Sequence, residues 1–251
     1  MRGRRRGQVL VVAALAIALT IITVQASVYS LSRAGIVSDH DYLDDYILAI
    51  KQGSRHTVEA SLVNVSRGGD DSNLEANLDR WEAFVSEDYR FGRCELNSTP
   101  ASTVPYAGGV WLDWGVDGEG VSSACSDFTL NLSGRDVEVD WSFDVNTTTK
   151  VLISGSFVDL GGDSKEVNLI VNLLNEGAPS LAGSITLEYL NASLWTDPST
   201  LDSYSELDYG NGTYQYVFAG EIPGINVQIR AQVYDRRGIY VRAEDTLEEE
   251  Q

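Results

Sequence analysis

The sequence predicts an α+β protein with an N-terminal transmembrane helix, a small head of helices and strands, and a C-terminal all-β sandwich. Three observations lead to this prediction. An uncharged apolar run follows four arginines, helix-spaced apolar residues follow that run, and short segments of alternating polarity fill the rest of the chain. The predicted divisions are residues 1–33 (basic leader and helix), 34–145 (head), 146–243 (sandwich) and 244–251 (acidic tail).

The first element is the run from Gln8 to Ser32, since no charged residue appears between Arg6 and Arg33. A bilayer core of about 30 Å needs roughly 20 mainly apolar residues, and the run meets this length. The arginines before it and the acidic chain after it place the N-terminus in the cytoplasm by the positive-inside rule. The sequence therefore predicts a single-pass protein of the cell membrane whose bulk lies outside the cell.

Three interpretations of this run stay open. The segment Val24-Gln25-Ala26 fits the cleavage pattern of a secretory signal peptide, although the run is longer than the usual apolar core of such signals. A plain signal anchor is the second interpretation. The third rests on residues 4–10, Arg-Arg-Arg-Gly-Gln-Val-Leu, which resemble the class III signal of archaeal type IV pilins. This resemblance implies that a leader peptidase cuts between Gly7 and Gln8, and that other pilin-like subunits or further copies of the chain are partners.

The charge of the chain argues against a nucleic-acid partner. Removing the four leader arginines from 18 basic residues leaves 14 against 37 acidic residues, a net charge of −23 for the remainder. Such a field repels a polyanion, and no basic stripe in the sequence cancels it.

The two cysteines, Cys94 and Cys125, both follow the apolar run. In an oxidising compartment they are expected to form one disulfide, worth about 3 kcal/mol for a loop of about 30 residues. Two cysteines and two histidines do not make a convincing zinc site.

Six N-x-[ST] sequons are a second sign of export and favour a glycosylated surface protein. Asn211 is followed by Gly212, so that site also has a structural explanation as a turn. The predicted glycosylation sites are Asn64, Asn97, Asn131, Asn146, Asn191 and Asn211.

Helical spacing predicts three helices in the head. The first begins after Ser38, and the second runs from Ser54 to Val65 and stops at Gly68. The third is the clearest, because Ser72 and Glu75 have the spacing of a capping box. Its apolar face is formed by Leu74, Leu78, Trp81 and Val85.

Short β-rich runs follow from residue 91. Strands are predicted over residues 106–115, 128–132 and 137–145, and a polar boundary over residues 146–149. Six more are predicted over residues 151–158, 166–174, 183–190, 212–219, 225–234 and 238–243, which together describe an immunoglobulin-like sandwich. Within them, residues 167–177 and 184–189 resemble the strand, Asn-x-Gly turn, strand pattern of CARDB and fibronectin-like modules. The tail after residue 243 is expected to be frayed.

No set of residues predicts catalysis. The only histidines, His40 and His56, fall on predicted helix surfaces, and the chain has no G-x-S-x-G, H-E-x-x-H or P-loop pattern. We expect no enzyme activity and no cofactor.

Two acidic clusters and three tryptophans are weaker candidates for binding. Residues 39–45 hold four aspartates, and Asp113, Asp117 and Glu119 share a loop, but neither cluster has EF-hand spacing, so solvated acidic surfaces are favoured over calcium sites. We therefore expect no metal. Trp111, Trp114 and Trp141 could form a sugar-binding platform, but tryptophans at alternating strand positions favour the core.

These features predict a membrane-anchored extracellular structural or interaction protein, a pilin-like surface or filament subunit of an archaeal cell envelope. The alternative is a single-pass anchored surface module for adhesion or carbohydrate binding.

Overall fold

The computed structural model describes residue 25 and residues 43–89, 92–134 and 138–250. The chain forms two compact units, Met1–Gln52 and Gly53–Gln251. In the first unit residues 43–52 are helical and Ile50 is buried. The second unit holds helical residues 53–66, helix α2 (Asn73–Asp88) and all the strands that occur among the described residues.

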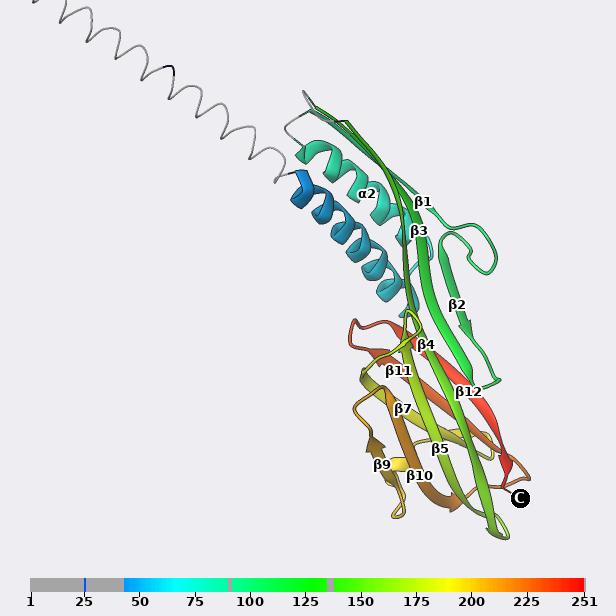
Figure 1. Cartoon of the computed structure of the whole chain (residues 1–251). Coiled ribbons are helices and arrows are strands. Elements are labelled where there is room, and N and C mark those ends of the chain that lie inside the picture. Colours follow the sequence, from blue (N-terminus) through cyan, green and yellow to red (C-terminus); the bar gives the residue numbers. More distant parts are fainter. Residues whose placement is uncertain (1–24, 26–42, 90–91, 135–137, 251) are drawn as a thin grey trace, which may run out of the picture. The chain divides into compact units, whose positions relative to one another are not determined.

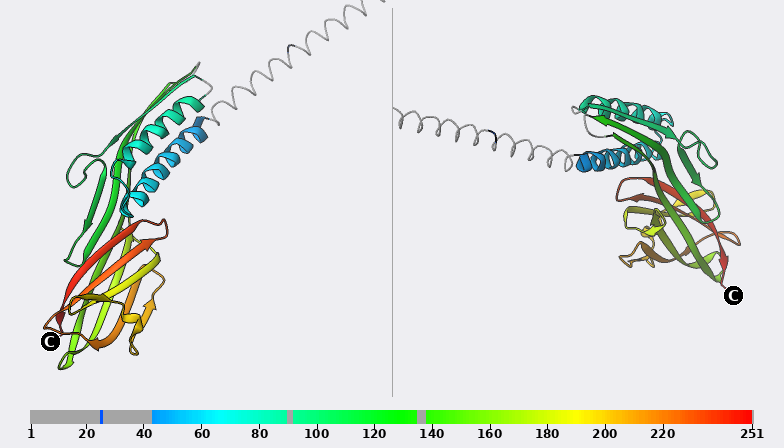
Figure 2. Two further views of the ribbon diagram at one scale, coloured as in Figure 1. Left: turned by 180° about the vertical axis from the view of Figure 1, so that it is seen from behind. Right: turned by 45° about the horizontal axis from the view of Figure 1, so that its top comes forward.

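The helical residues 53–66 and helix α2 lie on one face of three strands. These strands are β1 (Gly92–Pro100), β3 (Glu119–Gly134) and the first half of β4 (Glu138–Gly161). Figures 1 and 2 show the two helices side by side. Helix α2 buries Leu74, Leu78 and Val85 on the side that faces the strands. The carboxylate of Glu82 accepts a hydrogen bond of 2.6 Å from the backbone N–H of Ser98 and so ties α2 to β1.

Strands β3 and β4 form a long antiparallel hairpin, paired from Ser133↔Glu138 to Glu119↔Leu152. At one end β3 also pairs with β1, and at the other end with β2 (Val110–Trp114). The second half of β4 leaves the helix-covered part and pairs with β5 (Ser164–Asn175). One strand of 24 residues therefore belongs both to the helix-covered sheet and to the sandwich.

The sandwich has two leaves. The β4 leaf consists of the second half of β4, β5, β10 (Thr213–Glu221) and β9 (Ser205–Asp208). The β11 leaf consists of β8 (Leu194–Thr196), β7 (Ala182–Asn191), β11 (Val227–Asp235) and β12 (Tyr240–Glu249). A short parallel pairing of β12 with β4, at Glu248↔Ser156, joins the leaves into one sheet of 12 strands. The remaining elements are β6 (Ala178–Pro179), which pairs with β5, and the 3-10 turn Pro198–Thr200.

The hydrophobic core lies between the two leaves. Every second residue points inward, as the period of a strand requires. From β5 these are Val167, Leu169, Val171 and Leu173, and from β11 Val227, Ile229, Ala231 and Val233, all with no exposed area.

A buried carboxylate fastens the β11–β12 turn to β4. Asp235 is 2 % exposed, and its Oδ2 accepts hydrogen bonds from Thr149 Oγ1 (3.0 Å), Asn175 Nδ2 (3.1 Å) and Arg237 Nε (2.7 Å). Its Oδ1 accepts from the backbone N–H groups of Arg237 and Ile239, both at 2.9 Å. A buried charge is tolerated only when its bonding capacity is filled in this way.

The predicted fold class is wrong. The structure is mostly β, and its strands form one curled sheet rather than a separate head and sandwich. The polar residues 146–149, read as a boundary, lie inside β4, because the hydroxyl of Thr149 is satisfied by Asp235 and Asn175 and can be buried in a strand. The tail also differs from the prediction, since β12 continues to Glu249 and buries Leu247.

The predicted single-pass membrane anchor, with the bulk of the chain outside the cell, is not upheld. Among the residues that the structure describes, no helix is long and apolar enough to cross a membrane. The apolar run itself lies outside the described residues, apart from Gln25.

The predicted disulfide is absent, and both cysteines are thiols. Cys94 pairs in register with Leu132 of β3, which lies seven positions along the strand from Cys125. At a rise of about 3.3 Å per residue this is about 23 Å, whereas a disulfide needs Cα atoms within about 7 Å. An odd separation also places the two side chains on opposite faces of the sheet.

The structure therefore predicts two titratable thiols when the chain is denatured under non-reducing conditions, and finding none would show that the bridge forms.

In the native chain the pKa of Cys125 is raised by burial and by the nearby Asp127 and Asp144 carboxylates. A higher pKa leaves less thiolate, so Asp127→Asn is expected to speed alkylation of Cys125 at slightly alkaline pH. Glu221→Gln, an exposed change on β10, serves as the control.

Asp235→Ala is expected to lower the free energy of unfolding by about 3–5 kcal/mol, because it leaves the half-buried Arg237 guanidinium without its buried carboxylate partner. The change is measured from urea unfolding curves. Asp202→Ala, at an exposed position, is the matched control and is expected to change stability by less than about 0.5 kcal/mol. Equal effects of the two changes would contradict a bracing role for Asp235.

Candidate functional site

The outward side of the β11 leaf is the best candidate for a binding site. Because the odd-numbered residues of β11 fill the core, the even-numbered ones point outward together with Tyr240 and Arg242 of β12. We call this surface the polar-aromatic face. It consists of Trp114, Glu188, Trp195, Arg230, Gln232, Tyr234, Tyr240 and Arg242.

A hydrogen-bonded row crosses the polar-aromatic face. Glu188 of β7 accepts from Arg230 Nε and from Gln232 Nε2, both at 2.7 Å, and the Arg230 Nη2 lies 2.6 Å from the same carboxylate. Gln232 in turn accepts from the hydroxyl of Tyr240 at 2.9 Å. Burial raises the pKa of Tyr240, which keeps this hydroxyl a donor. The row holds its side chains in fixed positions, as a binding surface requires.

Cations and rings alternate across the same face. The guanidinium of Arg230 lies 4.3 Å from the ring centroid of Trp195, and that of Arg242 lies 5.6 Å from Trp114. Trp114 and Tyr240 pack edge to face at 5.1 Å. Arg242 Nε is buried and has no hydrogen-bond partner, since its nearest carboxylate, Glu244, is 3.8 Å away. This donor therefore has no hydrogen-bond partner, although it is shielded from solvent.

A small cavity of about 70 Å³ adjoins the face, between Trp195, Gln228 and Val116. Asp245 also lines it, and burial together with the nearby Asp117 carboxylate raises the pKa of Asp245. The cavity has room for about two water molecules at roughly 30 Å³ each, or for one small polar group of a larger ligand.

The three tryptophans singled out from the sequence do not come together. Trp111 packs edge to face on Tyr106, at 6.2 Å between ring centroids, and Trp141 stacks on Phe143 at 4.4 Å. Only Trp114 belongs to the polar-aromatic face.

Three of the predicted glycosylation sites lie on the side of the β1–β3–β4 sheet that faces away from the helices. The register places Asn97 opposite Thr129, Asn131 opposite Glu95, and Asn146 opposite Cys125. Asn97 and Asn146 are exposed and Asn131 is half-buried. Occupancy of these sites stays a prediction.

The other three predicted sites are dispersed. Asn64 is exposed on a helix, but the hydroxyl-bearing residue of its sequon, Ser66, is 1 % exposed and accepts a hydrogen bond from the backbone of Tyr240. Asn191 is half-buried. Asn211 is exposed and accepts from the backbone N–H of Thr213, which confirms the turn explanation for that residue.

The remaining candidates do not form a site in the described part of the chain. Asp113 and Asp117 are exposed, and Glu119 pairs with Lys150 at 2.5 Å. No group of three or more metal-ligating side chains occurs among the described residues. His40, Asp39, Asp41 and the predicted cleavage site at Gly7 and Gln8 lie outside them, and His56 is an exposed helix residue.

Sequence reasoning missed Trp195, Arg230, Gln232 and Arg242. One signal was present, because long polar side chains alternate with apolar ones from residue 227 to 234. Alternation identifies a strand with one polar face, but it does not tell which neighbouring strands add to that face.

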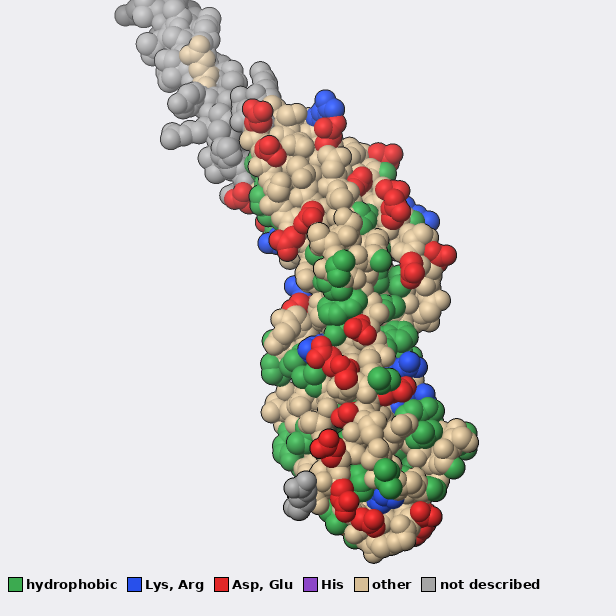
Figure 3. Space-filling model, turned by 90° about the vertical axis from the view of Figure 1, so that its right-hand side faces the viewer, with side chains coloured by type: hydrophobic (Ala, Val, Ile, Leu, Met, Phe, Trp, Pro, Cys, Tyr) green, Lys and Arg blue, Asp and Glu red, His purple; other side chains and the backbone are tan. Residues whose placement is uncertain are grey.

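The surface charge agrees with the acidic composition. On the face drawn in Figure 3, acidic side chains are spread over the surface and basic ones stand singly among them.

Comparison with known proteins adds no assignment, since no protein-family model, no curated protein and no solved structure matches this chain.

Asp245→Asn is expected to stabilise the protein at neutral pH. The pKa of Asp245 is raised above 3.8 in the folded state, so the fold favours the protonated carboxyl group over the carboxylate. The stability that this group contributes is therefore present below pH 3.8 and is lost as pH rises through the folded-state pKa. An amide does not ionise and still accepts from the N–H of Thr246. The urea midpoint of the variant should exceed that of the wild type at pH 7, and the difference should vanish below pH 3.8. Asp113→Asn controls for the loss of one exposed charge, and a pH-independent gain would refute this account.

Proposed function

We propose that this chain is a structural and interaction protein, a pilin-like filament subunit. The observation that carries the proposal is strand β4, which runs without a break from the helix-covered sheet into the sandwich. A subunit under load needs its parts joined by structure rather than by a flexible linker. The hydrogen bonds of Asp235 add a second connection between the sandwich and β4.

The resemblance of residues 4–10 to a class III signal supports the same proposal from the other end of the chain. After cleavage at Gly7 the apolar residues that follow would begin the mature chain. A run of apolar residues with alanines four apart, such as Ala14 and Ala18, favours close packing of helices. In this proposal the apolar run assembles the subunits, and the second unit, held together by β4 and Asp235, is displayed on the filament.

A second candidate function is carbohydrate binding by the polar-aromatic face. The specific observation that favours it is the pairing of two half-buried tryptophan rings, Trp114 and Trp195, with polar groups held by hydrogen bonds and ring contacts. Sugars present apolar faces to aromatic rings and hydroxyl groups to amide, guanidinium and carboxylate side chains. The face offers all of these groups within one sheet.

The filament proposal is tested by cleavage and assembly together. We expect the mature chain to begin at Gln8 on N-terminal sequencing, and negative-stain microscopy of the producing cells to show filaments that an antibody to the second unit labels. Gly7→Val is expected to retain the leader and abolish the filaments. Gly3→Val, the matched change at another leader glycine, should process normally. A mature chain that begins at Met1 or Ser27 would contradict the proposal.

The carbohydrate proposal is tested on a glycan array, followed by titration of the glycans that bind. Trp195→Ala is expected to weaken their affinity by about tenfold, which corresponds to the loss of one ring contact. Tyr209→Ala removes an exposed aromatic side chain outside the face and should leave affinity unchanged. Equal losses in the two variants, or an array without binding, would rule out this use of the face.

A further inference from the structure

Helix α2 presents a second, separate surface on the side that faces away from the strands. Its buried positions are Leu74, Leu78 and Val85, whereas Arg80, Ala83, Phe84 and Glu87 are all exposed. These four recur at spacings of three, four and seven residues, so they lie on one side of the helix. We call them the α2 outer face.

The α2 outer face holds a large apolar side chain in a fixed position. Phe84 is 58 % exposed, and its ring stacks on Trp81 with centroids 5.6 Å apart. Trp81 is itself fixed, because its indole N–H donates to Ser54 Oγ at 2.9 Å and its ring lies directly against Gly53. An exposed ring that rests on a rigid support is typical of contact surfaces rather than of solvated helix positions.

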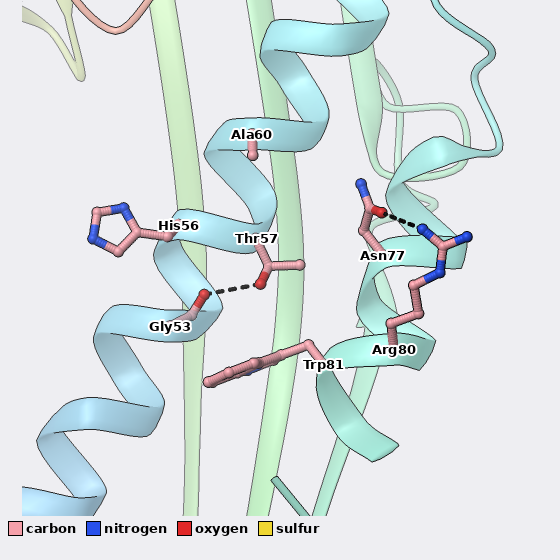
Figure 4. A pocket seen from close by; sticks show the side chains of 7 residues that line it. All are labelled: Gly53, His56, Thr57, Ala60, Asn77, Arg80 and Trp81. Carbon is pink, nitrogen blue, oxygen red and sulfur yellow. Dashed lines mark hydrogen bonds between the residues drawn. The ribbon is translucent and has the colours of Figure 1, made fainter. Parts of the chain in front are cut away.

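A groove runs beside Trp81, between α2 and the helical residues that begin at Gly53 (Figure 4). Its volume is about 470 Å³. Thr57 and Ala60 line one side, and Asn77 and Arg80 line the other, so small side chains leave space next to Trp81. The groove allows a partner's side chain to lie against the helices.

The charges on the α2 outer face suggest which partner fits. Arg80 and Glu87 are two helical turns apart, about 10.5 Å along the axis, so they do not pair with each other. A two-fold axis between Ala83 and Phe84 brings Arg80 opposite the partner's Glu87 twice. The same axis sets Phe84 against the small side chain of the partner's Ala83. A parallel arrangement would instead place like charges together, so complementarity selects the antiparallel pairing.

We propose that the α2 outer face binds the same face of a second copy of this chain, with the two α2 helices antiparallel about an axis between Ala83 and Phe84. The contact joins one α2 to another and involves neither the polar-aromatic face nor the leader. It is therefore independent of both functions proposed above. It would form a dimer whether or not filaments assemble.

The test is charge reversal, followed by sedimentation velocity of the purified full chain over a wide range of concentrations. Arg80→Glu and Glu87→Arg each place like charges together at both ends of the contact. We expect each to weaken the dimer at least about tenfold. The double variant restores both pairs and is expected to dimerise as the wild type does. Since the two residues do not interact within one helix, such a rescue reports a contact between copies in this register.

Phe84→Asp is expected to abolish the dimer, whereas Ile225→Asp should not affect it. Ile225 is 87 % exposed on the loop between β10 and β11, away from the helices, so it controls for the loss of an exposed apolar side chain. Circular dichroism checks that each variant is folded. A wild-type chain that is monomeric at every concentration overturns the proposal. Association that the charge reversals leave unchanged, or that the double variant fails to restore, overturns it as well, since the copies would then meet elsewhere.

Discussion

The second unit depends on one strand being shared by two layers. Strand β4 pairs with β3 along its first half and with β5 along its second, so the helix-covered sheet and the sandwich cannot move apart without breaking a continuous ladder of hydrogen bonds. A shared strand brings its neighbours close together. A Cβ at Gly120 of β3 would lie 2.0 Å from the carbonyl oxygen of Arg242 in β12, so only glycine permits the approach. Gly118 and Glu244 form a backbone hydrogen bond of 2.8 Å beside it.

The polar-aromatic face follows from this arrangement. Because β2 and β3 pack against β12, Trp114 comes to lie beside Tyr240 and Arg242, which are more than 120 residues away in the chain. The helix that ends at residue 66 reaches the same area. Arg67 donates to the carbonyl oxygen of Gly238 at 2.9 Å and lies 5.2 Å from the ring centroid of Tyr234. The polar-aromatic face is thus built where the helix, strand β2 and the β11 leaf meet.

Sheet edges in the second unit carry charges that discourage unwanted pairing. The first half of β4 has no strand on its second side among the described residues, and Glu138, Asp140 and Asp144 line it on one face. Two such edges in antiparallel contact would set carboxylates against each other. Strand β9 is short and carries Glu206 and Asp208 at the other end of the sheet. Association through a helix surface such as α2 avoids these edges.

Local pattern determined much of the secondary structure. Apolar spacing predicted helix α2, and alternation predicted the core strands β5, β7, β10 and β11, because burying one face of a helix or strand imposes its period on the sequence. The capping detail was not determined: the hydroxyl of Ser72 donates to Asp70 instead of capping the helix. A short side chain has several nearby acceptors, and spacing alone does not choose between them.

Tertiary structure decided what depends on distant partners. Thr149 is a strand residue because Asp235 and Asn175 satisfy its hydroxyl. Residues 244–249 form a strand because β11 pairs with residues 244–247 and β4 pairs with Glu248 and Glu249. Register keeps Cys94 and Cys125 apart, although their number and spacing suggested a disulfide. The polar-aromatic face likewise exists only once β2, β7, β8, β11 and β12 are placed side by side. The sequence by itself determined which side chains turn inward, because that follows from the period of each element. Which outward side chains meet was decided by strand pairing, whose register depends on contacts between residues far apart in the chain.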